Sequence, residues 1–193
     1  AVGGAAAGRA EVEALEGLFA QMLDLSRLDA GALAPRIGPV ALAPLFARVA
    51  ADVAPQAATA GLELHVAPTS LAVQSDPVLL ERIVRNFAAN ALAYTRSGGV
   101  LLGARRVGDA VRIDVVDTGI GIAPADRERI FEEFVQAAPG TRPHGAGRGL
   151  GLGLAIVRRL AALLRHPVET ASVPGRGSRF SVRVPRAATA PRT

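Results

Sequence analysis

Three short segments carry polar residues or glycines in patterns that a purely structural core would not require. Asn86 and Asn90 lie four residues apart, so on a helix their amide oxygens share one face and suit a hard cation such as Mg²⁺. Residues 117–122 (DTGIGI) follow an apolar run; a carboxylate fixed there can accept a hydrogen bond from the amine of adenine, and the glycines let the backbone approach the ring. Residues 149–154 (GLGLGL) enter an apolar helical pattern, whose first backbone N–H groups form an anion site.

Each segment also has a structural interpretation, which the residues alone leave open. The asparagines can be a capped or solvent-facing pair, DTG can be an ordinary turn, and Gly-Leu repeats can serve close packing. Two other functions are excluded. An aspartic protease needs a second aspartate in a similar setting, and a dinucleotide-binding fold needs a strand directly before the glycines, where this chain has an irregular run over 136–148.

Helices and strands alternate among the elements that must position these segments. Helical patterns cover 41–60, 76–94 and 149–164, with Asp76 as N-cap and Pro77 as first residue of the second helix, and a shorter helical piece covers 127–134. Alternating or apolar runs predict strands at 62–66, 71–74, 100–106, 111–117, 168–172 and 178–184. This order predicts an α/β fold, a two-layer sandwich of a mixed β-sheet with about three helices on one face, preceded by a long N-terminal helix.

Composition divides the chain into five segments. We expect a flexible terminus at 1–10, an amphipathic helix at 11–31, a Pro/Gly-rich linker at 32–40, one domain at 41–185 and a tail at 186–193. The amphipathic helix carries an apolar stripe of Leu15, Leu18, Met22 and Leu25. Such a helix needs a partner, which is either its own domain or a dimerising bundle, and we favour the bundle.

The charge composition excludes further classes of protein. The 193 residues include 22 cationic residues, all arginine, against 17 acidic residues, and the chain has neither lysine nor cysteine. Disulfide-stapled modules, cysteine-based metal or redox sites, Schiff-base enzymes and the usual lysine-containing P-loop are therefore excluded. The arginines look scattered and aromatic residues make up 4%, so we expect no nucleic-acid partner. The longest uncharged run has twelve residues, 64–75, so we expect no membrane segment, and we see no signal peptide.

Five segments occur together in an order that is far more specific than any one of them. On these segments the chain resembles the ATP-binding catalytic domain of bacterial sensor histidine kinases, in the ATPase superfamily shared with gyrase and MutL. Residues 82–95 (RIVRNFAANALAYT) resemble the N box of that family, and residues 117–122 resemble its first glycine box. Residues 130–134 (IFEEF) resemble the F box and residues 149–160 (GLGLGLAIVRRL) the second glycine box. Residues 175–185 (GRGSRFSVRVP) resemble the closing strands. Residues 22–31 (MLDLSRLDAG) resemble the end of the second dimerisation helix, so the resemblance covers about residues 12–185.

The resemblance implies a role for each candidate residue. Asn90 would bind Mg²⁺ with Asn86 beside it, and Asp117 would bind the adenine amino group, with a water shared with Ser178. Residues 136–148 would form a lid over ATP, with Phe131 and Phe134 at its base. The pocket lining and the phosphate-facing backbone would come from Tyr94, Gly119, Ile120, Gly121, Ile122, Gly149, Leu150, Gly151, Leu152, Gly153 and Leu154.

One departure from the family pattern concerns phosphate binding. The N box of the family usually has a basic residue three positions after its second asparagine, and this chain has Ala93 there. Arg142 or Arg148 of the lid, or Arg96 just beyond the helix, would have to supply the catalytic cation instead.

A second departure concerns the phosphate acceptor, which in the family is a histidine followed by an acidic residue on the first dimerisation helix. His65, His144 and His166 all lack that context, and the first dimerisation helix is not recognisable. The resemblance therefore implies a protein-histidine kinase catalytic domain that uses ATP and Mg²⁺ and transfers the γ-phosphoryl group to a histidine not present in this chain.

The resemblance also implies partners. We expect the histidine-containing dimerisation domain of the parent kinase, a response regulator downstream in a two-component phosphorelay, and a second copy of the chain in a homodimer. We expect a cytoplasmic location for this domain, which is compatible with a membrane anchor elsewhere in the parent protein. The alternatives are a non-catalytic ATP-binding or interaction module, an ATPase of the superfamily, and a serine kinase with the same pocket. The ATPases usually have glutamate in place of Asn86 to activate water, so the asparagine favours phosphoryl transfer.

Overall fold

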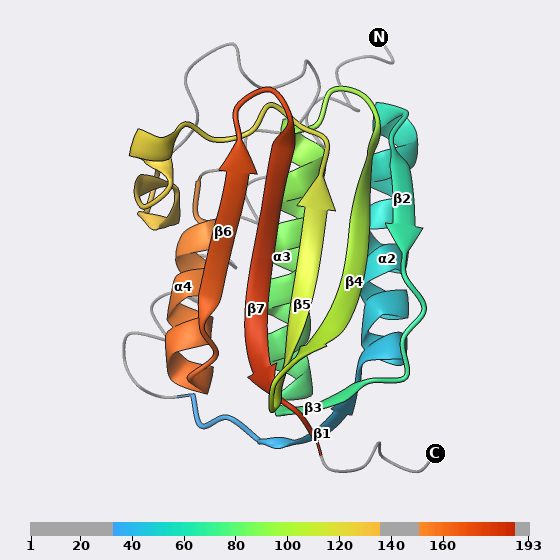
Figure 1. The fold of residues 1–193 in the computed structure, drawn as a ribbon, viewed down its shortest axis with the longest axis vertical. Helices are drawn as coiled ribbons and strands as arrows, with labels where there is room; N and C mark the ends of the chain where they lie inside the picture. The colour runs from blue at the N-terminus through green and yellow to red at the C-terminus, as the bar shows by residue number, and fades with distance from the viewer. Residues whose placement is uncertain (1–32, 136–150, 188–193) are drawn as a thin grey trace, which may run out of the picture.

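Each α-helix is followed by two strands along residues 33–135 and 151–187, the parts of the chain that the computed structural model describes (Figure 1). Three α-helices cover Leu42–Ala60 (α2), Pro77–Tyr94 (α3) and Gly153–Leu164 (α4). Two short 3-10 helices, Pro124–Asp126 (η1) and Arg129–Phe131 (η2), follow the fifth strand. The strands are Gly38–Ala41 (β1), Glu63–Val66 (β2), Ala72–Ser75 (β3), Gly99–Val107 (β4), Ala110–Asp117 (β5), Val168–Val173 (β6) and Gly177–Pro185 (β7).

Five of the strands form a mixed sheet in the order β2-β4-β5-β7-β6. β2 pairs parallel to β4, and the other neighbouring strands pair antiparallel. Figure 1 shows α2, α3 and α4 side by side behind this sheet. The core lies between the two layers, where Phe46, Ile83 and Val115 have no exposed surface. The prediction of an α/β fold with a mixed sheet is therefore confirmed.

Helix α3 begins where the sequence predicts because its first turn is capped by a local side chain. Oδ1 of Asp76 accepts hydrogen bonds from the backbone N–H groups of Val78 at 2.9 Å and Leu79 at 3.0 Å. Pro77 occupies the first turn, where its missing N–H costs nothing. Oδ2 of Asp76 accepts from the N–H of Arg36 at 2.8 Å, so the same carboxylate also holds the segment before β1.

Three elements differ from the sequence prediction. Of the helical piece expected at 127–134, only Arg129–Phe131 (η2) is helical, as a 3-10 helix. The end of the expected linker at 32–40 contributes to β1, which pairs antiparallel with β3. Helix α4 begins at Gly153 rather than at position 149, because Gly151 has a φ of +73° that an α-helix does not accommodate.

The remaining segment predictions concern residues that are not described. The long N-terminal helix and the terminus before it fall within residues 1–32, and most of the tail falls within 188–193. The domain boundaries therefore stay predictions. Among the described residues, no helix combines the length and the apolar character needed to cross a membrane.

Candidate functional site

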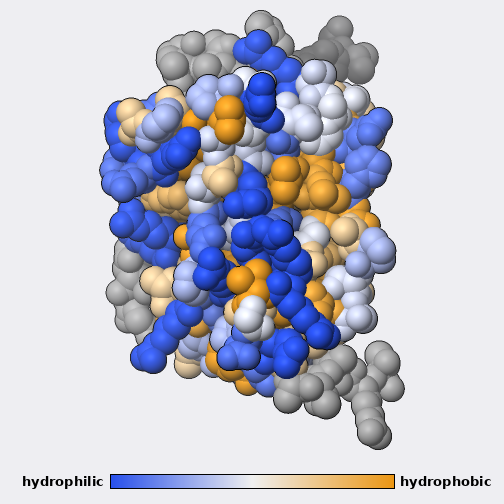
Figure 2. Space-filling view, viewed as in Figure 1, coloured by the Kyte–Doolittle hydropathy of each residue, from blue (hydrophilic) through white to orange (hydrophobic). Residues whose placement is uncertain are grey.

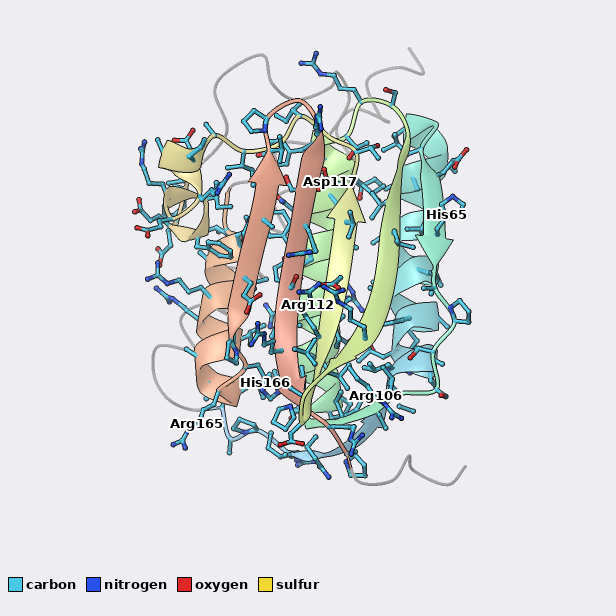
Figure 3. All side chains as sticks on the ribbon, in the orientation of Figure 1. His65, Arg106, Arg112, Asp117, Arg165 and His166 are labelled. Carbon is cyan, nitrogen blue, oxygen red and sulfur yellow. The ribbon has the colours of Figure 1, made fainter. Side chains whose placement is uncertain are left out.

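The carboxyl end of β5 holds a buried carboxylate, that of Asp117 (Figure 3). The residue is 5% exposed, because alternation along β5 turns it toward the helix side with Ile113 and Val115. Its Oδ1 accepts hydrogen bonds from the backbone N–H groups of Gly119 at 2.8 Å and Ser178 at 3.1 Å. Burial raises the pKa of Asp117 above 3.8, and these two N–H donors partly offset that rise. Oδ2 accepts no hydrogen bond from the described residues, so it can accept one from a ligand.

The loop after Asp117 is held between the end of α3 and the turn that joins β6 to β7. The N–H of Ile120 donates to the carbonyl oxygen of Tyr94 at 3.1 Å, and the N–H of Gly175 donates to the carbonyl oxygen of Ile120 at 2.7 Å. A Cβ on Gly119 would overlap the Tyr94 carbonyl oxygen. A side chain at position 119 is therefore excluded by the close approach of two backbones.

A hydroxyl group that the sequence analysis missed joins this loop to the closing strands. Ser172 is 7% exposed, and its Oγ accepts from the N–H of Ile122 at 2.7 Å and lies 2.9 Å from Oγ of Ser178. The same hydroxyl donates to the carbonyl oxygen of Gly177 at 3.0 Å. Nη2 of Arg127 donates to the Ser172 carbonyl oxygen at 2.7 Å. The sequence offered one signal for Ser172, the alternation within the two closing strands. That signal places Ser172 opposite Ser178 only when the register of the strands is known.

The two asparagines lie on α3, where Asn86 meets the start of α4. Nδ2 of Asn86 donates to the carbonyl oxygen of Arg82 at 2.8 Å, and its Oδ1 would lie 3.0 Å from a Cβ on Gly153. Helix α4 begins at Gly153, and no side chain caps its first turn. An amide oxygen and uncapped backbone N–H groups therefore meet at one point, where a cation and an anion can bind together. Asn90 is half-buried one turn further along α3.

The other predicted site residues have different environments. Leu152 and Leu154 are 1% and 8% exposed and belong to the hydrophobic core, so only their backbone groups can contact a ligand. Phe131 packs edge-on against Phe180, with 6.5 Å between the ring centroids. Phe134 is 60% exposed and has a φ of +61°. The predictions for Arg142, Arg148, Gly149 and Leu150 concern positions outside the described residues.

The two described histidines are well separated from Asp117 in Figure 3. His166 is 4% exposed, its Nε2 lies 2.8 Å from Oγ of Ser75, and burial lowers its pKa below 6.5. His65 is on β2 at the edge of the sheet, where its Nε2 lies 3.0 Å from Oε2 of Glu63. Position 144 lies outside the described residues.

Neither a metal cluster nor a large cavity marks the site in the described parts of the chain. Within residues 33–135 and 151–187, no group of three or more His, Asp and Glu side chains could hold a metal ion. A cavity of about 970 Å³ lies instead between η2, α4 and β6, and Phe131 is the one candidate residue that lines it. The candidate site is therefore defined by the contacts of Asp117, Asn86 and the glycines.

The family of histidine kinase-, DNA gyrase B- and HSP90-like ATPases matches residues 75–188. The sensor-like histidine kinase SenX3 of Mycobacterium tuberculosis is 35% identical over 177 residues, which are 91% of this chain and 43% of SenX3. The sensor histidine kinase RcsC of Escherichia coli is 36% identical over 126 residues, 65% of this chain and 13% of RcsC. This chain thus spans less than half the length of these two relatives.

Solved structures are similar over most of the chain. Full-length ShkA in complex with AMPPNP gives a TM-score of 0.79 at 38% identity and covers 92% of this chain and 37% of ShkA. The histidine kinase AdeS of Acinetobacter baumannii gives a TM-score of 0.72 at 22% identity, with 90% of this chain and 79% of AdeS covered. At that identity AdeS supports the fold alone.

Proposed function

The chain belongs to the histidine kinase-, DNA gyrase B- and HSP90-like ATPase family, and we propose that its site transfers the γ-phosphoryl group of ATP to a histidine of a partner domain. It is the ATP-binding catalytic domain of a sensor histidine kinase. The observation that carries the proposal is the buried carboxylate of Asp117, which is held by two backbone N–H groups beside Gly119, where the close Tyr94 carbonyl oxygen leaves no room for a side chain.

Asp117 would select adenine over other bases. Its Oδ1 is occupied by the N–H groups of Gly119 and Ser178, so the carboxylate has a fixed orientation and offers Oδ2 to the adenine amine. A buried acceptor with this geometry rejects a base that presents a carbonyl at the same position, because two acceptors would then face each other. Gly121 and Ile122 would line the ring together with Tyr94, Gly119 and Ile120.

Asn86 and Asn90 would hold Mg²⁺ next to the phosphates. Support comes from the uncapped start of α4 at Gly153 and the Oδ1 of Asn86 beside it, because amide oxygens and phosphate oxygens are the ligands that Mg²⁺ prefers. When bound, Mg²⁺ offsets negative charge on the phosphoryl group. The backbone N–H groups from Gly149 to Leu154 would contact the phosphates.

Asn86 also favours a kinase over a hydrolase. Its Nδ2 donates to the Arg82 carbonyl oxygen at 2.8 Å, and a carboxylate at that position has no N–H to donate. An amide cannot take a proton from water, so this side chain does not provide the general base that a hydrolase requires.

The cation that faces the γ-phosphoryl group would be an arginine. Ala93 offers no charge at the usual position, so we assign this role to Arg142 or Arg148, with Arg96 as the alternative. Neither described histidine suits the acceptor, because His166 is buried against Ser75 and His65 lies on the β2 edge. The acceptor would belong to a dimerisation domain of the parent kinase, and a response regulator would receive the phosphoryl group next. We also propose a cytoplasmic location and a homodimer through the 11–31 segment.

Nucleotide titration followed by phosphotransfer tests the proposal. ATP with Mg²⁺ should bind to the full chain, and Asp117→Asn should weaken binding about tenfold to a hundredfold, since hydrogen bonds to charged groups contribute about 1.5–3 kcal/mol. Asp114→Asn is the matched control, because it makes the same change on the other face of β5. Radiolabelled phosphate should then move from ATP to an added histidine-containing dimerisation domain.

Three outcomes would overturn the proposal. Equal ATP affinity in the Asp117→Asn and Asp114→Asn variants would show that the adenine does not bind at the end of β5. Binding of ATP without transfer to any of several dimerisation domains would favour the non-catalytic module instead. Multiple-turnover release of inorganic phosphate without phosphotransfer would favour a hydrolase.

A further inference from the structure

The face of the five-stranded sheet that turns away from α2, α3 and α4 carries a row of arginines. Antiparallel register places Arg105 of β4 opposite Arg112 of β5, and Arg112 opposite Arg183 of β7. Directly opposed residues point to the same face. Because Val111 and Ile113, the neighbours of Arg112 on β5, are fully buried on the helix side, the three guanidinium groups share the open face, where Arg112 is labelled in Figure 3.

Two carboxylates in the next row compensate part of this charge. Asp114 and Glu169 both lie opposite Ser181 of β7. Nη2 of Arg112 donates to Oδ2 of Asp114 at 3.1 Å, and Nη2 of Arg183 lies 2.7 Å from Oε1 of Glu169. Asp114 also lies 3.8 Å from Nε of Arg105, so one carboxylate serves two arginines.

Arg179 adds a fourth positive charge in the row beyond the carboxylates. It lies between Val116 of β5 and Ala171 of β6, and its guanidinium makes no ion pair with any described residue. The Nε atoms of Arg179 and Arg183 are buried without a hydrogen-bond partner among the residues that the structure describes. Glu63 of β2 also lies on this face, at the sheet edge, because its neighbour Leu64 packs against the core. Four arginines against three carboxylates leave the face with a surplus of one positive charge.

Aliphatic side chains continue the face beside Arg179. Leu101 of β4 lies opposite Val116 and is 44% exposed, and Val173 of β6 is 55% exposed. Figure 2 shows hydrophilic side chains across the middle of this face and a hydrophobic patch beside them. Within the described residues no helix covers the face, whereas the opposite face is covered by three (Figure 1).

We propose that this open face, defined by Arg105, Arg112, Arg179 and Arg183 together with Leu101, Val116 and Val173, docks an acidic, amphipathic segment of a partner protein. Carboxylates of the partner would pair with the guanidinium groups, and its aliphatic side chains would cover the exposed leucine and valines. The surplus charge is too small and the face too poor in aromatic rings for a nucleic-acid site. Asp114 and Glu169 would also repel a polyphosphate or an anionic membrane, whereas a protein segment can place its own neutral groups over them.

This docking surface is distinct from the proposed nucleotide site. Asp117 projects to the helix side of β5, and the docking residues project to the other side, because neighbouring residues of a strand point to opposite faces. Failure of nucleotide binding and failure of docking are therefore separate results, measured with different ligands.

Fluorescence anisotropy with a defined peptide tests the docking surface. The probe is a labelled 20-residue helical peptide with glutamate on one side and leucine on the other, titrated with the full chain at low and at physiological ionic strength. Arg179→Glu and Arg105→Glu should each weaken binding about tenfold, through loss of one charge pair and gain of one repulsion. Arg106→Glu is the matched control and should change binding less than about twofold, because Arg106 is exposed one residue further along β4 and points to the other face.

Each variant is first checked by circular dichroism and by ATP binding, which none of these substitutions should change. If Arg179→Glu does not fold, the comparison of peptide binding between Arg105→Glu and its control Arg106→Glu decides the proposal by itself. Absence of peptide binding, or equal losses in the Arg105→Glu and Arg106→Glu variants, would overturn the proposal. Equal binding of a polyglutamate peptide without leucine would overturn its aliphatic part. Tighter binding of a single-stranded oligonucleotide or of anionic phospholipid vesicles, with the same dependence on Arg179, would assign the face to a different class of ligand and overturn it as well.

Discussion

Replacing Ser172 by alanine removes a buried hydroxyl that joins the loop after β5 to the turn between β6 and β7. The N–H of Ile122 loses its acceptor at 2.7 Å, and Ser178 loses a partner at 2.9 Å. A buried polar group left without a partner costs about 1–3 kcal/mol. We therefore expect the free energy of unfolding to fall by about 2 kcal/mol, which lowers Tm by about 4–8 °C in a chain of this size.

The same substitution should weaken nucleotide binding. Ser172 positions Ile122 and contacts Ser178, whose backbone N–H donates to Asp117 at 3.1 Å. At a temperature well below Tm, we expect the affinity for ATP to fall about fivefold to tenfold, the equivalent of one weakened hydrogen bond. Urea unfolding measures the stability, and calorimetric titration with ATP and Mg²⁺ measures the affinity.

Ser181→Ala provides the control that separates these two effects. Ser181 is 1% exposed, and its hydroxyl donates to Oδ1 of Asp114 at 2.6 Å, so its loss should destabilise the fold by a similar amount. The side chain faces away from Asp117, however, and ATP affinity should stay at the wild-type value. The reasoning would be refuted if Ser172→Ala were as stable as the wild type. It would also be refuted if both variants lost the same affinity for ATP.

Three further predictions follow from buried groups of the site and its surroundings. Gly119→Ala should lower the free energy of unfolding by about 1–3 kcal/mol in urea, because the new methyl group overlaps the Tyr94 carbonyl oxygen. Asp117→Asn should be more stable than wild type at pH 7. Burial raises the pKa of Asp117 above 3.8, so the stability of the wild type falls as the pH rises from 3.8 through the raised value. Urea titrations should show that the variant loses its advantage below pH 3.8. Burial lowers the pKa of His166 below 6.5, so thermal melts should show wild-type stability intact above pH 6.5 and falling below it. That loss should disappear in His166→Gln and persist in His65→Gln.

Elements whose ends depend on local chemistry could be predicted from the sequence. The helix expected at 76–94 is observed at Pro77–Tyr94, because Asp76 and Pro77 are sufficient to define its first turn. The strand expected at 111–117 is observed at Ala110–Asp117, because alternation and the glycines that follow it are both visible in the sequence. Asp117 was identified for the same reason, as a carboxylate where an apolar strand ends.

Features that depend on strand register could not be predicted. Ser172 is an ordinary serine until β6 pairs with β7 and places it opposite Ser178. The arginines looked scattered along the sequence, yet pairing of β4, β5 and β7 brings Arg105, Arg112 and Arg183 into one row. Register between strands is set by contacts distant in sequence, so no local pattern reports it.

The start of α4 was mispredicted for a related reason. Apolar periodicity from position 149 onward is helical, but Gly151 adopts a φ of +73°, and a Cβ there would overlap the carbonyl oxygen of Val135. A contact made by a preceding segment therefore delays the helix by one turn. As a result, the first uncapped N–H groups lie at Gly153, next to Asn86, rather than at position 149.

Strand β5 explains why the candidate site has a single buried carboxylate. Burial against the helices requires apolar side chains at Val111, Ile113 and Val115, all of which have no exposed surface, and their backbone N–H groups are engaged in strand pairing. Beyond Val116 and Arg179, the last pair between β5 and β7, the backbone has N–H groups to spare on this side, and those of Gly119 and Ser178 reach Asp117. A carboxylate two residues earlier would be equally buried but would lack these donors. The position of Asp117 at the end of the strand is therefore what makes its burial tolerable and leaves one oxygen for a ligand.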